Sequence, residues 1–336
     1  MKLQDLKKLS LQMNLSPEDF APADTQEQQD LNKLTQNTSY WNDAWRRLKQ
    51  NKIAMIALFV IILFILFAFV GPLLSPYTYD QQIRGDENMA PNIKHPFGTD
   101  LHGRDLLVRV MVGSRISLII GIGSALIVLL IGSIYGAVSG LFGGIVDNLM
   151  MRFVEILYSV PDILIIILLQ IVIKEPLENA FNQGSLFGGL QKLGPGIVAI
   201  FIVYGLLYWV GMARIVRGQV LQLKQMEYVN AANAIGASKS RLIKKHLLPN
   251  CIGTLIVTTM LQIPSAIFTE AFLSFLGLGV SAPMASLGSL AADALNGIQS
   301  YPYRLLFPAG AISIIILAFN LFGDGLRDAL DPKLKK

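Results

Sequence analysis

The sequence predicts an all-α membrane protein that crosses the bilayer with six helices. Its 336 residues are 53% hydrophobic and only 15% charged, whereas a soluble domain carries about 25% charged residues. Charges are also absent from long stretches, each of which reaches the roughly 20 residues with which a helix crosses the hydrocarbon core. These stretches lie at residues 53–74, 116–146, 193–213, 247–269 and 305–323.

A sixth span is expected at residues 153–173. This stretch is less clear because Glu155, Pro161 and Asp162 interrupt it. It is retained because the charge balance described below requires it. The expected domain of residues 53–324 therefore has spans at about 53–74, 116–142, 153–173, 195–216, 251–272 and 305–323.

Two segments precede the first span. Residues 1–39 are polar with few aromatic residues, which predicts a disordered tail. Trp41 and Trp45 then share one helical face while arginine and lysine occupy the others, so residues 40–52 are expected to form an elbow helix in the membrane interface. Because the first apolar stretch begins after some fifty residues, it is interpreted as a retained span and not as a secretory signal.

The distribution of lysine and arginine predicts that both termini are cytoplasmic. Eight of these residues precede Ile53, one is Arg152, seven lie in 214–250 and four follow the last span, which leaves eight of the 28 for the other side. Cationic loops resist translocation, so the richer side is the cytoplasm. Removing the third span would place residues 214–250 outside. The formal charge of +5 is explained by this topology, and no nucleic-acid partner is expected.

Three further features stand out between the spans. Gly132, Gly136 and Gly140 recur every four residues, which predicts a helix face on which a neighbour packs closely. Glu270 follows the charge-free stretch 247–269, and a position near the outer interface is favoured over the bundle interior, where a carboxylate is costly. The outer loop contains His95, Asp100, His102 and Asp105 without a recognised metal spacing, so a polar loop is expected there and no metal.

The loop between the fourth and fifth spans has the features of a folded module. Residues 227–235 contain good helix formers, and Gly236 can end a helix with a positive φ. Ser238 is a suitable N-cap for a second, basic helix that ends at Pro249. The alanine face of the first helix is small and smooth, which favours docking into a groove of another protein over a membrane surface.

No catalytic motif is present. A phosphate-binding loop needs a Gly-Lys pair, and the chain contains none. The three histidines are dispersed, and the single cysteine, Cys251, excludes an intrachain disulfide. The chain is therefore expected not to be an enzyme and to hold neither a cofactor nor a metal.

The loop "EYVNAANAIGASKSRLIKKHLLPN" resembles the "EAA…G…LP" loop of bacterial ABC-importer permeases. The stretches "HPFGTDLHGRDLLVRVMVGSRISL", "FLSFLGLGV" and "GDGLRDALDPKLK" are similar to the C-type subunit of the oligopeptide/dipeptide (and nickel) permease family. The resemblance covers roughly residues 40–334. Asn230 stands where the motif has its acidic residue, and Glu227 keeps a carboxylate one turn earlier.

This resemblance implies a type I ABC importer fold in which loop 217–250 is a cytoplasmic coupling helix and residues 325–336 form a cytoplasmic C-terminus. It implies a multi-pass protein of the bacterial cytoplasmic membrane that translocates oligopeptides or dipeptides. Its partners would be a second homologous permease subunit, two cytoplasmic ATPase subunits that bind ATP and Mg, an extracytoplasmic peptide-binding protein and membrane lipid. The implied ATPase-coupling residues are Glu227, Tyr228, Asn230, Ala231, Ala232, Ala234, Gly236, Ala237 and Ser238.

Three alternatives remain open at this stage. The same machine could carry nickel or another small solute, because selectivity would rest with the binding protein. A secondary transporter or channel would need ionisable groups in mid-span, for which only Asp162 and Glu270 are candidates. A membrane-anchored structural or signalling subunit would not need a two-helix basic loop.

Overall fold

The computed structural model describes residues 40–182, 194–280 and 284–331. Contacts separate the chain into a unit of residues 1–46 and a unit of residues 47–336. Helix α3, Tyr40–Gln50, runs across this division, and the expected tail of residues 1–39 lies outside the described residues.

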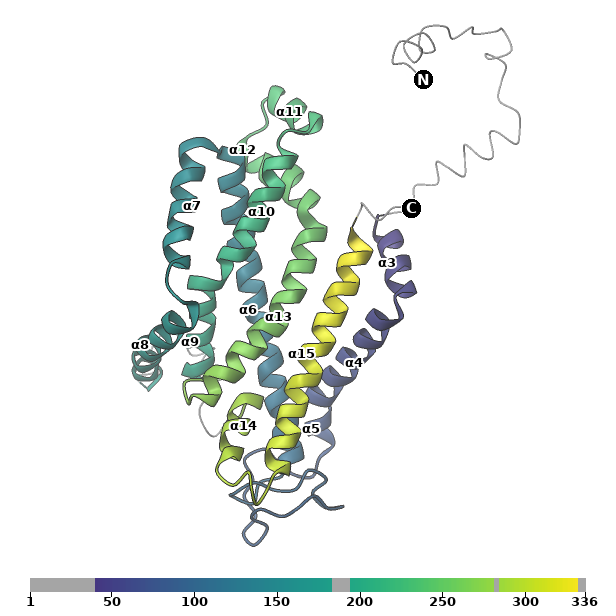
Figure 1. Ribbon diagram of the computed structural model, residues 1–336, viewed down its shortest axis with the longest axis vertical. Helices are drawn as coiled ribbons and strands as arrows, with labels where there is room; N and C mark the ends of the chain where they lie inside the picture. The colour runs from purple at the N-terminus through teal and green to yellow at the C-terminus, as the bar shows by residue number, and fades with distance from the viewer. Residues whose placement is uncertain (1–39, 183–193, 281–283, 332–336) are drawn as a thin grey trace, which may run out of the picture. The chain divides into compact units, whose positions relative to one another are not determined.

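The described part of the unit of residues 47–336 is helical and contains no strand, apart from an isolated bridge between Thr99 and Asp105. Three elements, η3, η4 and η5, are short π- or 3₁₀-helical segments that continue neighbouring helices. The elements are α4 Lys52–Phe69, α5 Gly71–Leu74, α6 Leu106–Phe142, α7 Gly144–Tyr158, α8 Asp162–Asn182, α9 Pro195–Val203, η3 Tyr204–Tyr208, α10 Trp209–Leu223, α11 Glu227–Ala234, α12 Lys239–Arg241, η4 Leu242–Leu247, η5 Leu248–Cys251, α13 Ile252–Phe275, α14 Leu287–Leu295 and α15 Tyr303–Leu330 (Figure 1).

Five continuous helical stretches are long and apolar enough to cross a membrane. They are 52–69, 106–142, 195–223, 239–275 and 303–330. The pair α7 and α8 would supply a sixth span, but the two helices are bent by 86°. The expected span 153–173 therefore falls on two helices. Pro161 lies in the break, and the residue before a proline is disfavoured in the helical region.

Helix α6 is longer than its charge-free stretch predicts. It begins ten residues before Ile116, because the Asp105 carboxylate caps it by accepting a hydrogen bond from the Val108 N–H at 2.8 Å. Arg109 and Arg115 therefore lie inside the helix. Gly143, with φ of 65°, ends it and leads directly into α7. The boundaries are thus set by capping chemistry, whereas absence of charge marks only the apolar part of the helix.

The glycine face of α6 packs against α10. A Cβ atom added to Gly132 would lie 2.6 Å from Met212 Cβ, and one added to Gly140 would lie 2.9 Å from Val220 Cγ1. Gly136 would meet the backbone carbonyl of Ala213. The neighbour that this repeat predicts is therefore α10. On its other sides α6 packs with α13 and α4, and α13 in turn packs with α15.

The two ends of the helical unit differ in character. Helices α11 and α12 project at one end, beside the turn between α6 and α7 (Figure 1). The loop of residues 75–105 and the connection from α14 to α15 lie at the opposite end (Figure 1). These are called the α11 end and the loop end below.

Candidate functional site

The first helix of the expected coupling module is closed by a glycine-dependent C-cap. Gly236 has φ of 85°, which favours glycine strongly. Its N–H donates to the Asn233 carbonyl at 3.1 Å, and the Ala237 N–H donates to the Ala232 carbonyl at 3.0 Å. These two bonds form the Schellman arrangement, which satisfies carbonyls that a helix end would leave unpaired. The turn that follows α11 is therefore fixed by hydrogen bonds.

The module is anchored to the unit by its apolar residues. Ser238 Oγ accepts from the Arg241 N–H at 3.3 Å and so starts the second helix. Val229, Leu242 and Leu247 are buried in the same cluster as Val220 of α10. Because both short helices contribute to this cluster, the module moves with the spans that flank it rather than as a free loop.

The structure separates the predicted contact residues into two sides of α11. Ala232 is only 7% exposed and packs against the unit, and Ala237 is half-buried. Successive residues on a helix point about 100° apart, so Ala231 and Ala232 cannot share one docking face. The remaining predicted residues are exposed at the α11 end: Glu227, Tyr228, Asn230, Ala231, Ala234, Gly236 and Ser238.

Ile235 is a surface feature that the sequence analysis did not identify. Its side chain is 87% exposed at the tip of the module, immediately before Gly236. Met226 and Tyr228 are exposed nearby. Covering such a side chain with a partner protein would contribute apolar burial to binding. The sequence could have indicated this exposure, because a Schellman cap at Gly236 places the preceding residue, Ile235, at the end of the helix.

The loop end is organised by paired charges. His95 is fully buried, and its Nδ1 lies 2.8 Å from Asp105 Oδ2. Because Asp105 also caps α6, this contact fastens the loop to the start of a span. Asp100 accepts from Arg104 Nε at 2.6 Å and lies 3.4 Å from Arg109 Nε. In the described residues no group of three His, Cys, Asp or Glu side chains is placed to hold a metal.

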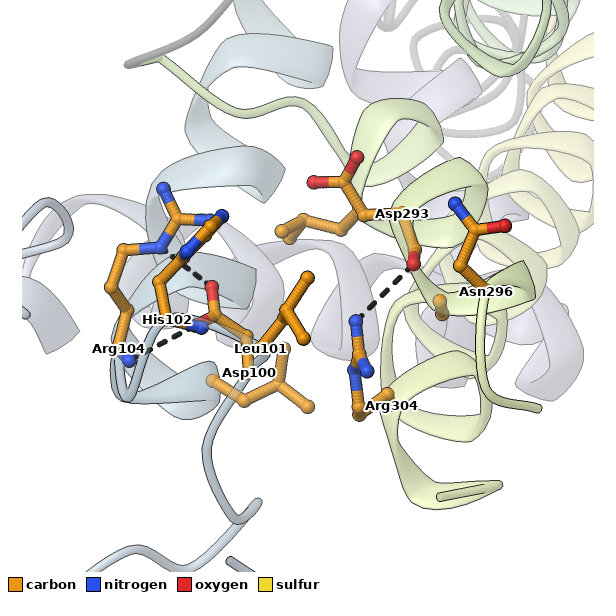
Figure 2. Close-up of a pocket in the computed structure, with 10 residues that line it drawn as sticks. Asp100, Leu101, His102, Arg104, Asp293, Asn296 and Arg304 are labelled. Atoms are coloured by element: carbon orange, nitrogen blue, oxygen red, sulfur yellow. Dashed lines mark hydrogen bonds and ion pairs between the residues drawn. The ribbon is translucent and has the colours of Figure 1, made fainter. Parts of the chain in front are cut away.

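A small cavity of about 120 Å³ opens between this loop and α14. Figure 2 shows Asp100, His102 and Arg104 on one side and Asp293, Asn296 and Arg304 on the other. Arg304 Nη2 donates to the Asp293 backbone carbonyl at 3.2 Å (Figure 2). Carboxylate and guanidinium groups both line this cavity, which suits a polar contact. The lining therefore favours neither an anion nor a cation.

Glu270 is buried between helices of the bundle, whereas the sequence favoured a position near the outer interface. Its side chain has no exposed surface. Its carboxylate accepts from Ser117 Oγ of α6 at 3.0 Å and from Ser274 Oγ of α13 at 2.7 Å. Ser286, the N-cap of α14, donates to Ser274 Oγ at 3.1 Å. The cost of burying the carboxylate is offset by these hydrogen bonds, which join α6, α13 and α14.

A second clasp joins α6, α7 and α10 near the α11 end. Arg217 donates to both oxygens of Asp147, at 2.5 and 2.6 Å. Ser139 Oγ donates to Asp147 Oδ1 at 2.5 Å. A bidentate arginine–carboxylate pair combines strength with fixed geometry. The partners are 70 residues apart, so sequence spacing gave no indication of this pair.

A larger cavity of about 600 Å³ opens between α8, α13 and α15. Isoleucine and phenylalanine supply half of its lining residues, and Tyr208, Ser265, Thr269 and Asn320 contribute uncharged polar groups. Among the described side chains, none that lines it is charged. A cavity of this kind can hydrogen-bond a passing solute without selecting it by charge.

The helical fold, the exposed module between two spans and the cavity among the spans together define an integral membrane transport component. The sequence matches the family described as binding-protein-dependent transport system inner membrane component over residues 132–336, and the chain belongs to this family. Residues 39–91 match the family described as N-terminal TM domain of oligopeptide transport permease C. The predicted all-α, type I permease fold is thereby confirmed.

Individual relatives cover nearly the whole chain. The oligopeptide transport system permease protein OppC of Bacillus subtilis (strain 168) is 47% identical over 91% of this chain and 94% of its own length. The dipeptide transport system permease protein DppC of the same organism is 48% identical over 89% and 87%. OppC of Escherichia coli (strain K12) is 43% identical over 88% and 92%.

Proposed function

We propose that this chain is a pore-forming permease subunit of an ATP-driven importer that translocates oligopeptides or dipeptides. The observation that carries the proposal is the exposed two-helix module between the fourth and fifth spans, in a chain whose relatives are named as peptide transport permeases. The protein would lie in the bacterial cytoplasmic membrane with both termini and the α11 end in the cytoplasm, as the lysine and arginine distribution favours.

The module would dock into a cleft of a cytoplasmic ATPase subunit. Ile235 would enter this cleft as an apolar anchor, and Ala231 and Ala234 would let the surrounding surfaces approach closely. Ala232, although expected at the contact, would instead keep α11 seated on η4. ATP and Mg would be bound by the partners, and closure of two ATPase subunits would pull the module together with α10 and α13.

The cargo path would run along the 600 Å³ cavity, at the contact with a second, homologous permease subunit. Its uncharged polar groups fit gated diffusion of peptides whose side chains vary in charge. The loop end would receive cargo from an extracytoplasmic binding protein. Nickel or another small solute would be compatible with the same machinery, and the names of the relatives favour peptides. Measuring what the cognate binding protein binds separates these cargoes.

A charge on Ile235 tests the docking. Ile235→Asp is expected to abolish copurification of the ATPase subunits, because the substitution removes an apolar anchor while losing no buried contact of this chain. Ile93→Asp is the matched control for copurification of the ATPase subunits, since Ile93 is a fully exposed isoleucine in the loop of residues 75–105, far from the module. Normal copurification and peptide uptake with Ile235→Asp would refute the docking mode. Ion flux through the isolated chain would instead favour a channel.

The glycine turn offers a second test of the same proposal. Gly236→Val is expected to uncouple ATP hydrolysis from uptake while membrane insertion persists, because a β-branched residue at φ of 85° costs about 1–3 kcal/mol. Gly144→Val is a control at the same end, where φ is also positive and a Cβ meets no atom within 4 Å. Wild-type coupling in the Gly236 variant would show that the turn geometry is not needed.

A further inference from the structure

A third cavity lies between α7 and α10, toward the α11 end, and no step of the proposed function uses it. Its volume is about 590 Å³, and it is lined by Asn148, Met151, Arg152, Glu155, Arg214 and Arg217. Three of these six residues are arginines, contributed by two different helices. The two helices are held together behind the cavity by an apolar cluster that includes Val154 and Trp209.

The positive charge of this cavity is only partly neutralised. Arg217 is paired with Asp147, and Arg152 Nη1 lies 3.1 Å from Glu155 Oε2. Arg214 has no carboxylate partner among the described residues. Its guanidinium lies over the Tyr158 ring, 4.5 Å from the ring centroid. This stacking holds the side chain in place and leaves its edge N–H groups available to an anion.

The surroundings of the cavity are those of a membrane surface. Arg214 is the first charged residue after the charge-free stretch 193–213, which is where the edge of the hydrocarbon core is expected. Leu149, Phe153 and Ile156 of α7 are exposed beside the cavity. A ligand that satisfies both features combines a negative headgroup with an apolar tail.

We infer that this cavity binds the phosphate of an anionic phospholipid, with Arg214 and Arg152 as its donors and α7 in contact with the acyl chain. Arg217, held by Asp147, sets the wall of the site and contributes charge. Basic pockets between transmembrane helices suit such headgroups, because each phosphate oxygen accepts hydrogen bonds from a planar guanidinium. The lipid would fill the gap between α7 and α10 and so add to the contacts that join them.

Native mass spectrometry of the full-length chain tests this site. The chain is released from nanodiscs containing equal amounts of phosphatidylglycerol and phosphatidylcholine, without ATPase subunits, so that failure here leaves the proposed function unaffected. Wild type is expected to retain phosphatidylglycerol preferentially. Arg214→Gln is expected to weaken retention by about tenfold, since a hydrogen bond to a charged group contributes at least this factor.

Two further variants keep the experiment decisive. Arg214→Lys retains the charge but loses the planar guanidinium, so its retention should fall between that of wild type and that of Arg214→Gln, which keeps the test open even if the glutamine variant folds poorly. Arg241→Gln removes an exposed arginine at the same end but outside the cavity, and it should leave retention unchanged. Equal retention of both lipids by wild type would overturn the inference, as would equal loss in the Arg241 and Arg214 variants.

Competing anions separate the possible sources of the ligand. Inorganic phosphate at millimolar concentration should not displace the lipid, because it lacks the acyl contact with α7. Displacement by inorganic phosphate would show a free-anion site and overturn the lipid assignment. Displacement by tri-alanine would place the cavity on the cargo path. Displacement by the purified partner permease subunit would show a protein contact. Either result would also overturn the lipid assignment.

Discussion

Replacing Gly136 with valine is expected to loosen the packing of α6 against α10. A Cβ atom at this position meets the backbone carbonyl of Ala213, and it would lie 2.9 Å from Val216 Cβ and 3.0 Å from the Arg217 backbone nitrogen. Two of these three atoms belong to the backbone of α10 and cannot rotate away. The helices must therefore separate, and Gly132 and Gly140 in the same row lose their close contacts as well.

The size of the effect follows from these distances. Ordinary carbon contacts lie at about 3.5–4.0 Å, so the helices would have to move apart by roughly 0.5–1 Å, a gap that forfeits about a quarter to a half of each dispersion contact across the seam. Overpacking of this kind costs about 1–3 kcal/mol. The valine also fills space with a β-branched side chain, so a loss near the upper end, about 2–3 kcal/mol, is expected.

The single cysteine provides the assay. Cys251 is 1% exposed and lies in the core cluster that includes residues of α6 and α10, so its reaction with a thiol-specific fluorophore during heating reports unfolding. Gly136→Val should react at a lower temperature than wild type. Gly218→Val, where a Cβ meets no atom within 4 Å, should not. Indistinguishable unfolding of the Gly136 variant and wild type would refute the close-packed seam.

Two other substitutions can be measured in the same way. Asp147→Asn is expected to destabilise the chain by about 1.5–3 kcal/mol, because it removes the charge that Arg217 and Ser139 bind; a wild-type melting curve at low salt would contradict this. Glu270→Leu should leave two buried serine hydroxyls without their acceptor, at about 1–3 kcal/mol each, whereas Glu270→Gln keeps a carbonyl acceptor and should cost much less. Equal effects of the two substitutions would show that the hydrogen bonds of Glu270 do not hold α6, α13 and α14 together.

Local features of the candidate site were predictable because they depend on residues close in sequence. A helix that ends in Ile235–Gly236 before a serine N-cap predicts the turn of the module, and the structure contains this turn with its Schellman bonds. The face of α11 that meets the unit was not predictable in the same way. It is fixed by Leu242 and Leu247, which cover Ala232 and leave Ile235 outside.

The contacts of charged side chains inside the bundle, in contrast, were not predictable from the sequence. The position of Glu270 depends on Ser117, which is 153 residues away, and a sequence pattern does not report such a partner. The sequence favoured the interface because an unpaired carboxylate is costly in a span. Hydrogen bonds from Ser117 and Ser274 offset part of that cost in the folded chain.

By itself, the sequence determined that this chain is an all-α membrane protein, that a glycine row on α6 receives a neighbour, and that a polar module stands between two spans. These properties follow from transfer of side chains out of water and from local capping, and both act over one helix at a time. Only the tertiary structure decided that α10 is that neighbour, that Ile235 forms the tip, and that Arg214 meets no carboxylate within the described part of the chain. Those outcomes depend on which distant side chains meet, and only packing in three dimensions selects them.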